Sequence, residues 1–125
     1  MKGTILIVED HDQVRATLHD WLGALFPQYT FFEAKSGEEA VNKVIAQTPT
    51  LVLMDIGLPR MNGIEATRMI KSASPETKVV ILTVYEDPQY QTDAASAGAS
   101  GYVVKRKMHI ELLPMMEKLL AQGEN

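Results

Sequence analysis

Apolar and polar positions divide the chain into short apolar runs separated by longer segments with helical spacing. Five runs are rich in apolar, mostly β-branched or aromatic residues and are predicted to be strands: 4–8, 29–34, 50–54, 78–83 and 101–104. Three of them contain ILIV, LVLM and VVIL, which are apolar without alternation. This pattern is typical of parallel strands that are buried on both faces. The run at 29–34 is more mixed and suits an edge strand.

The segments between these runs carry apolar residues at the period of a helix, and five helices are expected. Asp12 is the predicted N-cap of the first helix. Ser36 and Glu39 form a capping-box pattern ahead of the second. The third helix is expected from near residue 62 to about residue 72.

Prolines constrain the last two helices. Asp87 followed by Pro88 is typical of a helix start, and this fourth helix is expected to stop at Gly98. Pro114 lacks an N–H group, so it predicts that the fifth helix begins near residue 110 or 111 and holds the proline in its first turn. Five strands alternating with five helices indicate βαβ units and a mostly parallel sheet. The pattern alone therefore predicts an open, doubly wound α/β sandwich.

Polar residues stand where four of the five predicted strands end. Glu9 and Asp10 follow the first strand, and Asp55 follows the third. Thr83 ends the fourth strand, and Lys105 follows the fifth. Each residue alone is explained as a cap, a turn residue or solvated surface. Ligands of such sheets bind outside the carboxyl ends of the strands, so together these side chains predict a site.

The chemistry of this set favours a metal and a phosphoryl group. Three carboxylates at one edge repel one another, and Mg²⁺, which takes oxygen ligands, relieves that repulsion. The backbone carbonyl of Gly57 is a candidate for a further oxygen ligand. We predict that Asp55 is a nucleophile that forms an aspartyl phosphate. Lys105 would neutralise charge on the transferring oxygens, and Thr83 would donate a hydrogen bond to them.

Length and composition exclude several other classes. A chain of 125 residues suits one domain, residues 1–125, and the net charge of −4 gives no electrostatic footprint of nucleic-acid binding. The chain has no cysteine, which excludes disulfides and thiolate chemistry. No apolar stretch is long enough to span a membrane, and the N-terminal run is too short for a signal peptide, so a cytoplasmic location is expected. The segment ILIVEDHDQ lacks the glycine-rich turn of a dinucleotide site.

Four segments match a known family when they are taken together in their order and spacing: ILIVEDH, LVLMDIGLPRMNGIEA, VVILTVYED and GYVVK. They resemble the receiver domain of bacterial two-component response regulators, over nearly the whole chain. The resemblance implies a flavodoxin-like sheet in the strand order 2-1-3-4-5. It implies that a sensor histidine kinase donates a phosphoryl group to Asp55 in the presence of Mg²⁺. Glu9 and Asp10 would be acids of the metal site, and Lys105 would pair with the phosphate.

The resemblance also implies a switch and an output. Thr83 corresponds to the hydroxyl that moves on activation, and Tyr102 to the aromatic side chain that then turns inward; the alternative for Tyr102 is an ordinary strand residue packing on the fourth helix. The segment EDHDQVRATLHDWL is similar to the first helix of NarL/FixJ-type regulators, which usually carry a C-terminal LuxR-type helix-turn-helix that contacts DNA. Because the chain ends where that linker would begin, an isolated receiver and a single-domain regulator are both open. Phosphorylation is expected to alter a surface that forms a homodimer.

Some residues depart from the commonest family pattern. Glu9 stands where many members have aspartate, and it is expected to reach the metal through water. Val84 follows the switch threonine and is expected to narrow access to Asp55. Arg106 stands where many relatives have proline, so no cis peptide is expected there. With Lys107 it forms a small basic tip, explained either as a solvated loop or as a contact to a partner.

Two other functions fit the sequence less well. A phosphohydrolase that forms an aspartyl phosphate usually needs a carboxylate two residues after the nucleophile, and Gly57 occupies that position. The chain is therefore expected to catalyse only its own phosphorylation and dephosphorylation and not to be an enzyme acting on a substrate. The other alternative is a receiver that works as an interaction module without phosphorylation. The complete acidic set, Thr83 and Lys105 argue against it.

Overall fold

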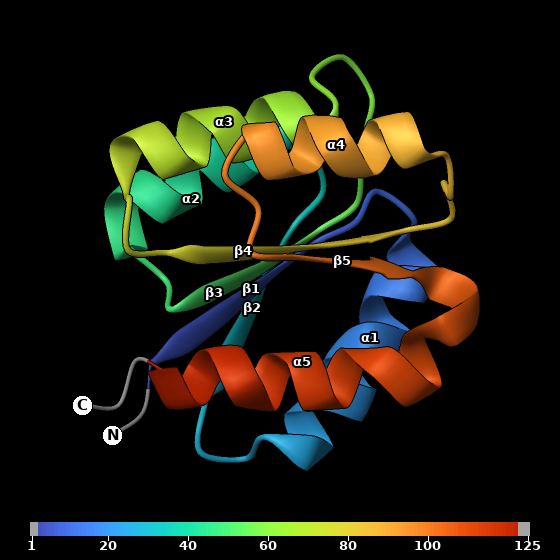
Figure 1. Ribbon diagram of the computed structural model, residues 1–125. Coiled ribbons are helices and arrows are strands. Elements are labelled where there is room, and N and C mark those ends of the chain that lie inside the picture. Colours follow the sequence, from blue (N-terminus) through green and yellow to red (C-terminus); the bar gives the residue numbers. More distant parts are fainter. Residues whose placement is uncertain (1–2, 123–125) are drawn as a thin grey trace.

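A parallel sheet of five strands runs through the centre of the molecule (Figure 1). The computed structural model describes residues 3–122. Its strands are β1 (Thr4–Val8), β2 (Thr30–Ala34), β3 (Leu51–Met54), β4 (Lys78–Thr83) and β5 (Gly101–Val104). All neighbouring pairs are parallel, in the order β2-β1-β3-β4-β5. The predicted fold class and strand order are confirmed, and the mixed run does form the edge strand β2.

The helices cover both faces of the sheet, with three on one side and two on the other (Figure 1). They are α1 (Asp12–Leu25), α2 (Gly37–Gln47), α3 (Gly63–Ala73), α4 (Pro88–Ser96) and α5 (Met108–Gln122), and a 3₁₀ turn, η1 (Lys105–Lys107), precedes α5. Helices α2, α3 and α4 pack on one face, and α1 and α5 on the other. Of the residues 3–122, no helix is long and apolar enough to cross a membrane.

The core consists of two apolar layers, one on each side of the sheet. Alternate residues of β1 enter opposite layers: Leu6 packs with the residues under α2 to α4, and Ile7 with those under α1 and α5. Both side chains are fully buried. This is why the central strands are apolar without alternation, as parallel strands covered on both faces must be.

The helix starts agree with the prediction in part. Ser36 does cap α2 by accepting a hydrogen bond from the N–H of Glu39 at 3.1 Å, but the Glu39 carboxylate accepts from the N–H of Lys35 instead of closing the box. The prediction that Asp12 is an N-cap was wrong. It is the first residue of α1, and His11 precedes it without a side-chain cap. The Asp12 carboxylate pairs with an arginine one turn later instead.

The predicted start of the fifth helix was also wrong, because α5 begins at Met108 and holds Pro114 inside it. The proline removes the hydrogen bond to the carbonyl of Ile110. Since Ile110 is 79% exposed, water is available to that carbonyl. Leu112 and Met116, on either side of the proline, are fully buried and hold the helix on the sheet. At Gly98, φ is +104°, which ends the α4 region as predicted.

Candidate functional site

The parallel register brings four of the predicted side chains to one edge of the sheet. Glu9, Asp55 and Lys105 follow β1, β3 and β5, and Thr83 is the last residue of β4. Glu9 is 1% exposed and Asp55 is 9% exposed, and Thr83 is fully buried. Acids buried to this degree need a counter-charge or hydrogen bonds. The site therefore consists of charged groups held out of water at the carboxyl end of the sheet.

Lys105 supplies the counter-charge. Its Nζ lies 2.6 Å from Oε1 of Glu9 and 3.5 Å from Oδ2 of Asp55. Burial alone would lower the pKa of Lys105, but the hydrogen bond to Glu9 and the charge of Asp55 outweigh it and raise the pKa. The ammonium group thus stays protonated between the two carboxylates. Lys105 is 96 residues from Glu9 and 50 residues from Asp55 in the sequence, and the three meet here, as predicted from the strand ends.

The loop after β1 collects groups that suit a divalent cation. Potential ligand atoms of Glu9, Asp10 and His11 lie within 4.8 Å of one another, and Asp10 and His11 are exposed. The other oxygen of Glu9 accepts a hydrogen bond from the N–H of His11 at 3.0 Å. Carboxylate oxygens at the rim of a buried, negatively charged site fit Mg²⁺, which keeps several of its waters. His11 was expected on the rim beside the acids, and it lies there.

The loop after β3 presents Asp55 from the other side of the site. The Gly57 N–H lies 3.3 Å from Oδ1 of Asp55, so both carboxylate oxygens have a polar neighbour. Gly57 as a metal ligand through its carbonyl stays a prediction. Asn62 caps α3 by accepting from the N–H groups of Ile64 and Glu65, which fixes the end of this loop. A Cβ added to Gly63 would lie 1.9 Å from the Asp55 carbonyl oxygen, so the loop passes against the start of α3.

The two predicted switch residues both form hydrogen bonds to the backbone of Tyr85. Thr83 Oγ1 accepts a hydrogen bond from the N–H of Tyr85 at 3.4 Å, and the Tyr102 hydroxyl donates to the carbonyl of Tyr85 at 2.8 Å. Tyr102 is also partly buried against the core layer that includes α4 residues. The packing expected of an ordinary strand residue is present, and the switch role of Tyr102 stays a prediction. Its pKa is raised by burial and by nearby tyrosine and carboxylate groups.

A family model described as the response regulator receiver domain matches residues 5–117. The chain belongs to this family.

Two of the similar curated proteins are named as transcriptional regulators. The chain is 37% identical over 120 residues to the transcriptional regulatory protein DegU of Brevibacillus brevis, covering 95% of this chain and 50% of that protein. It is 42% identical over 108 residues to the DNA-binding transcriptional activator DevR/DosR of Mycobacterium tuberculosis, covering 86% of this chain and 50% of that protein. The chain therefore spans about half the length of these curated relatives.

Solved structures agree with this assignment. A LuxR-family two-component response regulator from Aurantimonas sp. SI85-9A1 superposes with a TM-score of 0.90 at 34% identity, covering 98% of this chain and 87% of that one. The response regulator TrrA from Thermotoga maritima, in complex with Mg²⁺-BeF, superposes with a TM-score of 0.83 at 33% identity, covering 95% and 99%. The receiver assignment made from sequence motifs is confirmed.

One residue near the receiver site was not anticipated from the sequence. Tyr85 links Thr83 to Tyr102 through its backbone, and its ring stacks on Tyr90 with centroids 5.0 Å apart. A Cβ added to Gly57 would lie 3.3 Å from the Tyr85 hydroxyl, so the ring also lies beside the Asp55 loop. The sequence holds no signal for this, because the contacts are made by backbone atoms and by a ring between two loops.

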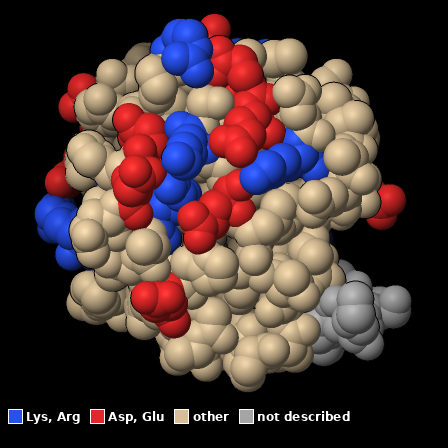
Figure 2. Space-filling view, turned by 180° about the vertical axis from the view of Figure 1, so that it is seen from behind, with Lys and Arg blue, Asp and Glu red and all other residues tan. Residues whose placement is uncertain are grey.

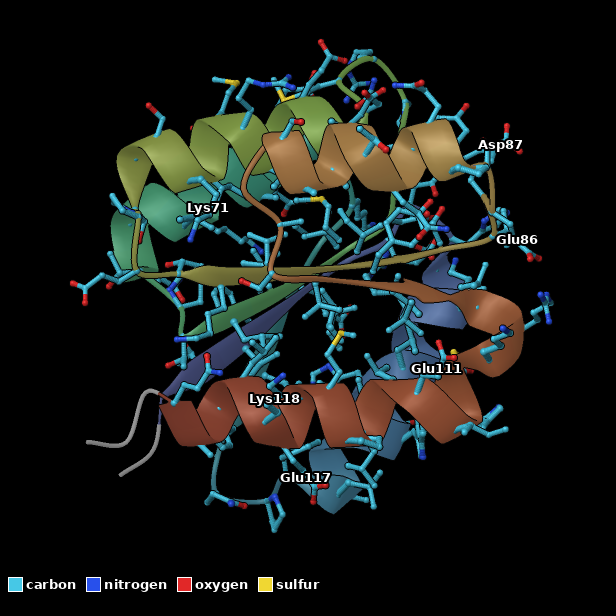
Figure 3. The ribbon with its side chains drawn as sticks, viewed as in Figure 1. Lys71, Glu86, Asp87, Glu111, Glu117 and Lys118 are labelled. Atoms are coloured by element: carbon cyan, nitrogen blue, oxygen red, sulfur yellow. The ribbon has the colours of Figure 1, made fainter. Side chains whose placement is uncertain are left out.

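Arg106, in the basic tip after β5, is paired within the molecule. Arg106 donates two hydrogen bonds to the Glu86 carboxylate, at 2.7 and 2.8 Å, and so ties the loop after β4 to the turn after β5. Figure 3 shows Glu86 beside Asp87 in the segment between β4 and α4. The peptide between Lys105 and Arg106 is trans, as expected. Val84 is exposed, and its effect on access to Asp55 stays a prediction.

Proposed function

We propose that this receiver is a phosphorylation switch. A sensor histidine kinase donates a phosphoryl group to Asp55 with Mg²⁺ bound at the acidic loop, and the chain then changes the surface through which it dimerises and acts on its output. The observation that carries the proposal is the position of Lys105, whose ammonium group lies against both Glu9 and Asp55 at the carboxyl edge of the sheet. A cation fixed there suits an anion that arrives beside Asp55.

The chain's own groups account for the transfer. A carboxylate oxygen of Asp55 forms a bond to phosphorus as the phosphorus–nitrogen bond of the donor histidine breaks, and its electron pair leaves with the imidazole, which takes up a solvent proton. Lys105 neutralises charge on the phosphoryl oxygens, and Thr83 donates a hydrogen bond to one of them. When bound, Mg²⁺ would add positive charge at the same oxygens, held by Glu9, Asp10 and Asp55.

The hydrogen bonds around Tyr85 support a coupling between the two switch residues. As Thr83 moves toward a phosphoryl oxygen, the long hydrogen bond that it accepts from the Tyr85 N–H is lost. Tyr102 bonds to the carbonyl of the same residue, so a change in the loop weakens its anchor as well. The loop after β4 and the start of β5 then change together. In thermodynamic terms, the phosphoryl group shifts an equilibrium between two arrangements of this loop.

The output is proposed from the relatives. DegU and DevR/DosR are named as transcriptional regulators, and this chain covers about half of each. We infer that phosphorylation controls homodimerisation and, through a C-terminal helix-turn-helix domain, transcription. We place the switch in the cytoplasm, with a receiver that binds no nucleic acid itself and that catalyses only its own phosphorylation and dephosphorylation.

Intact mass after incubation with Mg²⁺ and a small-molecule phosphodonor tests the proposal. The wild type should gain the mass of one phosphoryl group, and Asp55→Asn, which keeps the shape of the side chain, should gain none. Omitting Mg²⁺ should greatly reduce the gain. A folded wild type that stays unmodified would leave an interaction module that works without phosphorylation as the better account.

The coupling between the two switch residues has its own test. Thr83→Ala should still accept a phosphoryl group on Asp55, because the nucleophile is intact, but should no longer change oligomeric state in size-exclusion chromatography. Tyr102→Phe removes only the hydroxyl that bonds to Tyr85 and should uncouple the two events in the same way. A Thr83→Ala protein that is phosphorylated and changes oligomeric state like the wild type would refute the coupling.

A further inference from the structure

A buried guanidinium group contacts the backbone of the acidic loop at Glu9, whereas Lys105 contacts the Glu9 carboxylate. Arg15, in the first turns of α1, is 7% exposed. Its Nη1 donates to the backbone carbonyl of Glu9 at 2.8 Å. Its Nε donates to Oε1 of Glu33 at 2.7 Å, and its Nη2 donates to Oδ1 of Asp12 at 2.6 Å. One side chain thus joins the acidic loop, the edge strand β2 and the start of α1.

Glu33, which accepts the hydrogen bond from Nε of Arg15, is itself held by two further residues. Oε2 of Glu33 lies 2.5 Å from Nδ1 of His19, one turn further along α1, and the Lys43 ammonium group on α2 donates to the Glu33 carbonyl. Hydrogen bonds to His19 and Arg15 lower the pKa of the Glu33 carboxyl against the opposing effect of burial. Figure 2 shows acidic and basic side chains interleaved over the upper part of the face seen from behind. Glu33 is therefore a charged, fixed partner for the guanidinium group.

The bond to the Glu9 carbonyl fixes the peptide that carries Asp10. A peptide unit is planar, so holding its carbonyl oxygen also fixes the plane of the peptide and the position of the next Cα, from which the Asp10 side chain leaves. The Glu9 N–H is held as well, by the carbonyl of Ala34 at 3.1 Å, and the His11 N–H bonds to the Glu9 side chain. Asp10 itself is exposed. Its orientation therefore depends on the peptide on its N-terminal side, and Arg15 holds that peptide.

We propose that Arg15 is a positioning residue for the divalent cation: through its bond to the Glu9 carbonyl, it presents the acidic loop in the geometry that binds Mg²⁺. This inference rests on the proposed function. The three acceptors of Arg15 bond to three different nitrogens of its rigid guanidinium group, a span that the single nitrogen of a lysine ammonium does not provide. Arg15 contacts no reacting atom and acts only through the loop.

Two plainer roles for Arg15 predict different results. If the guanidinium acted only as a nearby positive charge, its removal would strengthen the binding of a cation. If it acted only on the stability of the fold, its removal would lower stability and leave the Mg²⁺ affinity of the folded protein unchanged. Positioning predicts weaker binding, because residues that orient metal ligands typically contribute about 10- to 100-fold in affinity.

The test is a titration with Mg²⁺ alone, followed by amide NMR shifts of the acidic loop, which also report whether each variant is folded. Arg15→Met and Arg15→Lys are compared with the wild type. Lys105→Met is the matched comparison, because it removes the other cation that contacts Glu9. Leu22→Ala, one turn beyond His19 on α1 and fully buried, lowers stability without contact to the loop.

We expect the Kd for Mg²⁺ to rise at least about tenfold in Arg15→Met and to rise in Arg15→Lys as well. It should fall in Lys105→Met and stay unchanged in Leu22→Ala. A Kd for Arg15→Met that equals or falls below the wild-type value overturns the inference. If Arg15→Met does not fold, Arg15→Lys decides by the same criterion. Failure of the wild type to bind Mg²⁺ would overturn the metal part of the proposed function and this inference with it, whereas wild-type binding with unaffected arginine variants overturns the inference alone.

Discussion

Replacing Lys105 by methionine keeps the length of the side chain and removes the ammonium group between Glu9 and Asp55. The loss of the ammonium group destabilises Glu9 more than Asp55. Glu9 is only 1% accessible to water, and its shortest hydrogen bond comes from Lys105. Its remaining partner is the His11 N–H. We therefore expect a less stable protein in the absence of metal, with a larger response to Mg²⁺.

The magnitude follows from the distances. Two unit charges 2.6 Å apart attract by roughly 1.6 kcal/mol at a dielectric constant of about 80 and roughly 6 kcal/mol at about 20. Desolvation of the ammonium group offsets part of this, and the Lys105 side chain keeps 21% of its exposure. A net loss of about 2 kcal/mol agrees with the range of about 1.5–3 kcal/mol for hydrogen bonds to charged groups. With a urea m-value of about 2 kcal/mol/M, the midpoint of unfolding falls by about 1 M.

Urea unfolding of the wild type and Lys105→Met, with and without Mg²⁺, measures both effects. Without the competing ammonium, Mg²⁺ should bind the variant about tenfold more tightly, which at saturating metal returns about 1.4 kcal/mol. Lys118→Met, at an exposed position of α5 visible in Figure 3, is the control and should match the wild type. Equal midpoints for wild type and Lys105→Met without Mg²⁺, or an equal rise of both with Mg²⁺, would refute this account of the site.

Two further changes test other parts of the structure. Gly63→Ala would place a Cβ 1.9 Å from the Asp55 carbonyl oxygen. We therefore expect the free energy of unfolding measured in urea to fall by about 1–3 kcal/mol and the phosphorylation of Asp55 to slow. An unaltered phosphorylation rate would show that the loop shifts freely. Because the hydrogen bonds of His19 and Arg15 lower the pKa of Glu33, its stabilisation is present above the ordinary carboxyl pKa near 4.5 and is lost as the pH falls through the folded value. Glu33→Gln should therefore flatten the fall of the urea midpoint between pH 6 and pH 3, and a slope equal to that of the wild type would contradict the assigned pKa shift.

Burial and hydrogen bonds within the chain explain where local patterns misled the prediction. Asp12 is a residue type that commonly caps helices, but its carboxylate pairs with Arg15, and the helix starts one residue earlier than predicted, at Asp12 itself. Pro114 ought to lie in a first turn, yet buried contacts of Leu112 and Met116 carry α5 through it. Propensity is a local preference of fractions to a few kcal/mol, and tertiary packing outweighs it at such positions.

The order of elements, the parallel sheet and the site at its carboxyl edge were determined by the sequence itself. Apolar runs without alternation require cover on both faces, and parallel strands bring Glu9, Asp55 and Lys105 to the same end whatever the details of the loops. Tertiary structure alone decided which groups touch: the ammonium between two carboxylates, the Tyr85 backbone between Thr83 and Tyr102, and the arginine behind the acidic loop. These contacts depend on how loops and side chains are placed in three dimensions. Those of Tyr85 and of Arg15 with Glu9 are made to backbone atoms, which every residue carries, so the one-dimensional pattern does not specify them.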